Sequence, residues 1–118
     1  MEIDKGTEKK IEELQILEKN LQGLLMQKQA VQVDLNETTN AADETKNAKS
    51  EIYRIVGGLM IRVEKEKITK EIDEKKKILG LRIDAIEKQE KLLDGKIEGL
   101  RSFINNIVNK EQPRKKQQ

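Results

Sequence analysis

The sequence predicts a mainly α fold, a long antiparallel two-helix coiled coil joined by a β-hairpin. Apolar residues recur at alternating spacings of three and four on both sides of the chain's middle. The middle reads IYRIVGGLMIRV, a β-branched run around a Gly-Gly pair. Charged residues make up 39% and aromatic residues 2% of the 118 residues, which is typical of long helices rather than of a compact globule. We therefore expect one domain, with helices at about 7–47 and 65–109, a hairpin at about 52–63 and a basic tail at 110–118.

Each predicted helix carries a heptad pattern sustained over four or more heptads, which is the signature of a coiled coil. On the first helix, position a falls at Leu14, Leu21, Lys28, Leu35 and Ala42, and position d at Lys10, Leu17, Leu24, Val31 and Thr38. On the second, position d falls at Ile72, Leu79, Ile86, Leu93, Leu100 and Ile107, and position a at Lys76, Ile83, Glu90, Ile97 and Ile104. If the chain folds back at Gly57, position a of one helix faces position d of the other. Leu21 then lies opposite Leu93, and the other seam pairs share the same numerical sum of 114.

Lys28 and Glu90 are charged residues at seam positions, in adjacent layers of this register. They can form an ion pair that fixes the register at some cost in stability. Alternatively, both can extend outward on their long side chains. The sequence leaves the two arrangements open.

The hairpin is predicted to pair residues 52–56 with residues 59–63. A three-residue loop, Gly57–Leu59, would separate the side chains into two distinct faces, whereas a two-residue loop mixes these sets, so we expect three. One face would then hold Tyr53, Ile55, Ile61 and Val63, and the other Arg54, Val56, Met60 and Arg62. A lone hairpin is marginal in water and leaves both edges unpaired, so strands of other chains should join it in a closed or layered sheet. The assembly residues are Tyr53, Ile55, Val56, Gly57, Gly58, Leu59, Met60, Ile61 and Val63.

Both ends of the chain should meet at the end of the coil that lies away from the hairpin. The apolar stripe widens there beyond the seam, whereas along the middle of the coil it is expected to stay narrow. A wide apolar stripe on a polar rod is a candidate binding surface. Gly95 and Gly99 weaken the second helix there, so the end should open readily. We call this set the tip cluster: Ile11, Leu14, Ile16, Leu17, Leu100, Phe103, Ile104, Ile107 and Val108. Ordinary fraying, or packing of these residues on one another, is the alternative.

Composition excludes several classes of function. The chain has no histidine and no cysteine, and its carboxylates are spread among lysines along helical surfaces, so neither an enzyme nor a metal or cofactor site is expected. No apolar run is long enough for a membrane span or a signal peptide, and the lack of cysteine fits a cytoplasmic protein. The basic tail suits docking to an acidic partner, or simply aids solubility; its cations are Lys110, Arg114, Lys115 and Lys116. Nucleic acid is not favoured, because no aromatic residue in the tail could stack on bases.

Residues 52–100 resemble the hairpin and second helix of an archaeal-type prefoldin beta subunit. The most specific parts are IYRIVGGLMIRV and RIDAIEKQEKLL, the latter at residues 82–93. Upstream, LQGLLMQKQAVQVDLNET at 21–38 is similar to that family's first helix. The single hairpin points to the beta class, since alpha-class subunits carry two. The chain departs from the family pattern in having more glycine in its second helix and less glutamine near its start.

The resemblance implies a hexamer of two alpha and four beta subunits, whose hairpins form a double β-barrel platform from which six coiled coils project. It further implies an ATP-independent chaperone that binds non-native polypeptides at the coiled-coil tips and delivers them to a group II chaperonin. The rim of that chaperonin would be the acidic partner of the basic tail. The alternative from another class is a structural coiled-coil scaffold without client activity.

Overall fold

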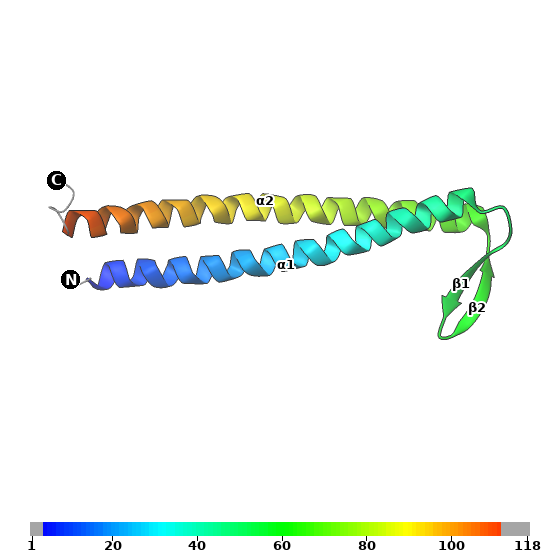
Figure 1. The fold of residues 1–118 in the computed structure, drawn as a ribbon, viewed down its shortest axis with the longest axis horizontal. Coiled ribbons are helices and arrows are strands. Elements are labelled where there is room, and N and C mark those ends of the chain that lie inside the picture. Colours follow the sequence, from blue (N-terminus) through cyan, green and yellow to red (C-terminus); the bar gives the residue numbers. More distant parts are fainter. Residues whose placement is uncertain (1–3, 112–118) are drawn as a thin grey trace. The chain divides into compact units, whose positions relative to one another are not determined.

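The computed structural model describes residues 4–111. Helix α1 spans Lys5–Asn47, strands β1 and β2 span Ile52–Val56 and Leu59–Val63, and helix α2 spans Lys65–Glu111 (Figure 1). The predicted fold class is confirmed, because two long helices flank one two-stranded antiparallel hairpin. Helix α2 runs two residues past its expected end, so Lys110 is helical.

The start of α1 is fixed by Asp4, which is its N-cap residue. The Asp4 Oδ1 atom accepts a hydrogen bond of 2.7 Å from the backbone N–H of Thr7. This bond satisfies one of the N–H groups that the first turn of a helix leaves unpaired. Because the same bond stabilises the ionised carboxylate, it lowers the pKa of Asp4.

The turn of the hairpin contains two residues, and the expected three-residue loop is wrong. Val56 pairs with Leu59, so only Gly57 and Gly58 lie between the strands. Both have positive φ, 55° and 82°, which is the conformation that a two-residue type I′ turn requires. Glycine adopts it without steric cost, and the turn follows the right-handed twist of the strands.

Residues 28–85 form one compact unit, which contains the hairpin and the adjoining parts of both helices. Its apolar core lies at seam positions of α2, where Leu79 and Ile83 are buried. On α1, the buried seam residue Thr38 donates its hydroxyl to the backbone carbonyl of Asp34 at 2.7 Å, so a polar group is buried with its hydrogen bond made. Lys75 forms an ion pair with the Asp34 carboxylate at 3.4 Å, which links the two helices of this unit.

The second compact unit contains residues up to 27 and from 86 onward. Ile86 and Ile97 of α2 are buried here, again at predicted seam positions, together with Thr7 of α1. Arg101 and Glu18 form an ion pair that joins the two helices of this unit. The side chains at both residues remain about half exposed to solvent, so this pair contributes little to stability on its own.

Candidate functional site

The hairpin exposes apolar side chains on both of its faces. Directly paired residues share a face, so Ile55 and Met60 lie on one side and Val56, Leu59 and Ile61 on the other. The face assignment expected from a three-residue loop is therefore also wrong, because it put Ile55 and Ile61 together. Exposure is high on both sides, with Ile55 73% and Leu59 68% exposed. Within residues 4–111, the apolar side chains of both faces thus remain largely exposed to solvent.

One arginine interrupts each apolar face of the hairpin and forms an ion pair near its base. Arg54 pairs with the carboxylate of Glu71 on α2, and Arg62 pairs with Glu51 at 3.6 Å. Glu51 also accepts a hydrogen bond of 2.7 Å from the hydroxyl of Tyr53. This bond favours the neutral phenol and so raises the pKa of Tyr53. The Arg54–Glu71 pair therefore links the hairpin to α2, and the contacts of Glu51 hold together the base of the hairpin.

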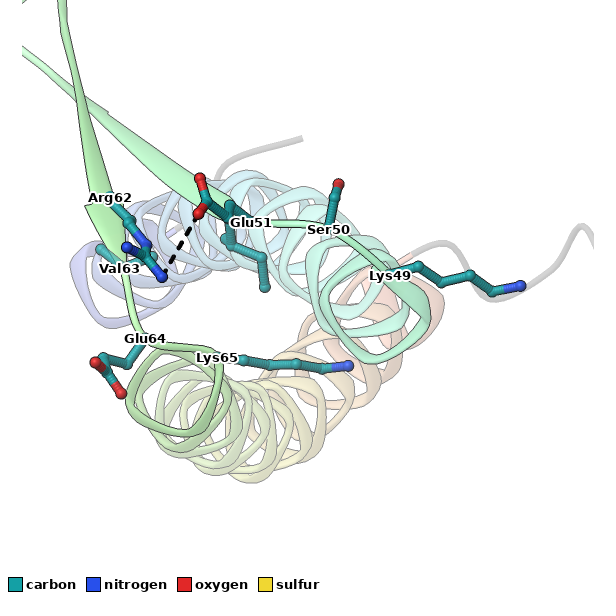
Figure 2. A pocket seen from close by; sticks show the side chains of 8 residues that line it. Lys49, Ser50, Glu51, Arg62, Val63, Glu64 and Lys65 are labelled. Atoms are coloured by element: carbon teal, nitrogen blue, oxygen red, sulfur yellow. Dashed lines mark ion pairs between the residues drawn. The ribbon is translucent and has the colours of Figure 1, made fainter.

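The base of the hairpin encloses an opening of about 490 Å³. Figure 2 shows Glu51 and Arg62 turned toward each other at its edge, whereas Lys49 and Glu64 extend away from it. The Lys65 ammonium donates to the backbone carbonyls of Lys46 and Ala48, each at 3.2 Å. Those carbonyls lie at the end of α1, where the helix leaves acceptors unpaired. Lys65 therefore fastens the first turn of α2 to the last turn of α1.

The tip cluster lies wholly in the unit of residues up to 27 and from 86 onward. Ile16 and Phe103 are its exposed members, at 60% and 45%, and the other seven are partly buried. The Lys10 ammonium lies over the Phe103 ring, 5.8 Å from its centroid, in a cation–π contact. Lys10 occupies a seam position of α1, so α1 offers no apolar side chain to the seam at this point. The Lys10 ammonium contacts the Phe103 ring instead.

Exposed apolar residues are not confined to the tip cluster. Leu81 is 66% and Leu92 68% exposed on α2, and Met26, Val33 and Ile78 are also exposed. The expectation of a narrow stripe along the middle of the coil is therefore wrong. The heptad pattern identified the seam but gave too little weight to single apolar residues on the outer positions.

A groove between α1 and α2 was not foreseen from the sequence. It measures about 530 Å³ and is lined by Lys19, Asn20, Gly23, Leu24, Gln27, Gln89, Leu92, Leu93 and Lys96. All of these residues belong to the same unit as the tip cluster. The signal in the sequence was Gly23, a glycine within a helical run, which leaves the groove open at its middle.

The basic residues expected to dock a partner fall mostly outside the described part of the chain. Lys110 is exposed on the last turn of α2, and Arg114, Lys115 and Lys116 lie beyond residue 111. Across residues 4–111, no group of three or more acidic, histidine or cysteine side chains is placed to hold a metal ion. Within the same residues, neither helix has a stretch apolar enough to cross a membrane.

The comparisons with known proteins all point to one family. The sequence profile of the prefoldin subunit family matches residues 8–111. The prefoldin subunit beta of Sulfurisphaera tokodaii is 35% identical over 102 residues, which cover 85% of this chain and 82% of that protein. That of Thermococcus kodakarensis is 34% identical over 98 residues, covering 81% of this chain and 84% of that protein.

The fold comparison agrees with these sequence relatives. The crystal structure of the prefoldin beta subunit from Thermococcus strain KS-1 matches with a TM-score of 0.83 and 31% identity, over 90% of this chain and 95% of that one. The match of the family profile to nearly the whole chain, together with relatives above 30% identity, shows the family. The chain belongs to the prefoldin subunit family.

Proposed function

We propose that this chain is the beta-type subunit of an ATP-independent chaperone, which assembles through its hairpin and holds non-native polypeptides. The observation that carries the proposal is the hairpin itself. It has two apolar faces and two open edges, and a hairpin of this size is marginal in water without further strands. Membership of the prefoldin family supplies the context in which such a hairpin acts as an assembly element.

The assembly that we propose is a hexamer of two alpha-type and four beta-type subunits. The hairpins of all six would close into a β-barrel platform, which removes the open edges and covers the apolar faces. A structural scaffold that needed only the coiled coil would gain nothing from exposing Ile55 and Leu59 on a lone hairpin. The hairpin therefore favours the chaperone over the scaffold.

Client binding would use the tip cluster. Apolar burial is not directional, so a surface of this kind selects for exposed apolar segments rather than for one sequence. Each contact is weak, and several subunits of one hexamer would supply affinity together. The work requires no chemical step, and we propose no catalysis for this chain.

Delivery would be to a group II chaperonin in the cytoplasm. Lys110 and the basic residues that follow it are the proposed contact with an acidic surface of that partner. Such a contact should weaken as salt is raised, because exposed charges are screened.

The test begins with the native mass of the complex purified through this chain from its own cells. We expect four copies of the 13.6 kDa chain with two copies of a larger subunit.

The complex should then suppress aggregation of a chemically unfolded reporter protein, and a variant carrying Ile16→Ser and Phe103→Ser should suppress it less. Ile78→Ser with Leu81→Ser is the matched control, since these residues are 56% and 66% exposed, at least as much on average as Ile16 and Phe103, but lie outside the tip cluster. A bare homodimer without suppression would overturn the proposed function, and equal loss in the control would move the client site elsewhere.

A further inference from the structure

The groove between α1 and α2 is lined in part by three leucines, of which Leu24 and Leu93 are themselves seam residues. Leu24 and Leu93 are partly buried in this lining, and Leu92 is 68% exposed. Gly23 contributes no side chain, and a Cβ atom added there would meet nothing within 4 Å. The volume of about 530 Å³ is within the range of about 300–1,000 Å³ that is usual for ligand pockets.

The charge on this groove has one sign. Lys19 and Lys96 flank it, and no carboxylate belongs to its lining. Neither lysine has an acidic residue three or four positions away on its own helix, so neither can form the usual helical ion pair. Within residues 4–111 neither forms any ion pair, whereas Lys75 and Arg101 are both paired across the helices of their units. Among the described residues, Lys19 and Lys96 are therefore two cations without an acidic partner, and they share the lining of the groove with its three leucines.

We propose that this groove binds apolar segments of a client polypeptide that carry carboxylates beside their apolar residues. The apolar side chain would cover Leu24, Leu92 and Leu93, and aspartate or glutamate of the client would reach Lys19 and Lys96. Both cations are exposed, so their preference for acidic segments is modest and depends on salt. The amide side chains of Asn20, Gln27 and Gln89 can bond to the client backbone.

This inference rests on the proposed function, because it assigns a charge preference to one part of the surface with which this chain would bind clients. It differs from the tip cluster in position and in chemistry. The residues of the tip cluster are all apolar, whereas the lining of the groove includes two lysines that give a reason to select among apolar segments. Charge complementarity identifies the occupant as a polypeptide with acidic residues rather than as a basic one.

The experiment measures fluorescence anisotropy of two labelled peptides with the assembled complex. One peptide has a leucine pair flanked by glutamates, and its twin has lysines in place of the glutamates. We expect the acidic peptide to bind about fivefold more tightly, which two exposed charge pairs can supply. The preference should disappear near 1 M salt, where the screening length is about 3 Å.

Charge reversal is the decisive variant. Lys19→Glu with Lys96→Glu should reverse the preference, so that the basic peptide binds more tightly. Lys70→Glu with Lys77→Glu makes the same change in net charge on exposed residues of α2 outside the groove, and should leave the preference as in the wild type. A preference that ignores the groove variant, or follows the control variant equally, overturns the proposal.

Filling the groove gives an independent test. Gly23→Gln should weaken binding of both peptides, while Gly80→Gln, at a helical glycine of the other unit that also has open space around it, should not. If Gly23→Gln instead lowers the native mass and leaves peptide affinity unchanged, the occupant is another subunit and the proposal is wrong. If the wild type suppresses aggregation but binds neither peptide, the groove proposal fails and the proposed function stands.

Discussion

The ionisation of Tyr53 reports on the hydrogen bonding at the base of the hairpin. Its hydroxyl donates to the Glu51 carboxylate at 2.7 Å, and Glu51 in turn pairs with Arg62 at 3.6 Å. The hydrogen bond needs the protonated phenol, so it raises the pKa of Tyr53 above the ordinary value of 10.0. The attraction of Arg62 for the phenolate acts in the opposite direction and is the smaller effect.

The folded protein should therefore ionise Tyr53 at a higher pH than the unfolded chain does. A raised pKa means that this bond stabilises the fold below pH 10 and that the contribution is lost as pH rises through the raised value. The chain has one tyrosine and no tryptophan, so absorbance at the phenolate band reports Tyr53 alone.

The matched variants are Glu51→Ala and Glu64→Ala. Removing Glu51 takes away the acceptor and should lower the pKa of Tyr53, whereas Glu64 points away from the Glu51–Arg62 pair (Figure 2) and its removal should not. Equal titration of Tyr53 in the wild type and in Glu51→Ala would contradict the hydrogen bond.

At the scale of elements, glycine has opposite roles in the helices and in the hairpin. Gly80 lies in α2 with ordinary helical backbone and open space around an added Cβ, while Gly58 holds a φ of +82° in the turn. Gly80→Ala should stabilise α2 by about 0.5–1 kcal/mol, because alanine loses less backbone entropy. Gly58→Ala should destabilise the hairpin by about 1–2 kcal/mol, because alanine resists the left-handed region.

Amide hydrogen exchange measures both effects in one experiment. Exchange should slow in α2 around residue 80 in the first variant and accelerate across β1 and β2 in the second. If Gly58→Ala left hairpin exchange unchanged, the two-residue turn would be incorrect. A slower α2 in Gly58→Ala would show that the effect is not local.

The helices and the existence of the hairpin could be predicted because their signals are repeated. A heptad pattern recurs over many turns, so one exception such as Lys28 does not obscure it. The length of the turn could not be predicted, because both faces of the hairpin are apolar. Alternation of polar and apolar residues normally fixes the register of a strand, and here it gives no choice between two loops. In the structure, Val56 pairs with Leu59, and the positive φ of Gly57 and Gly58 fits the two-residue turn between them.

The groove could not be predicted because it belongs to neither helix alone. Gly23 and Leu92 are 69 positions apart in sequence and meet only when the helices pair. Each looks unremarkable in its own helix, as a helical glycine and a surface leucine. In the sequence, Lys19 and Lys96 are likewise only two of 24 cations. The structure shows that both belong to the lining of one groove.

At the scale of the whole molecule, a hairpin with two apolar faces needs more than strands added at its edges. Edge pairing would satisfy the backbone of β1 and β2 but leave Ile55 on one face and Ile61 on the other in water. Both faces are covered only if the joined strands also pack in layers or curl into a closed sheet. The proposed platform meets that requirement.

The corrected register allows the two faces to be tested one at a time. Ile55→Lys places a charge on one face and Ile61→Lys on the other, and each should reduce the native mass of the complex, because burying an unpaired lysine is costly. Leu81→Lys is the control, since Leu81 is 66% exposed on α2, away from the hairpin. Native mass spectrometry gives the assembly state, and circular dichroism should show helix content retained in all three. If only one hairpin variant dissociates the complex, only that face is buried and the sheet is a single open layer. If neither does, the hairpin is not the assembly element.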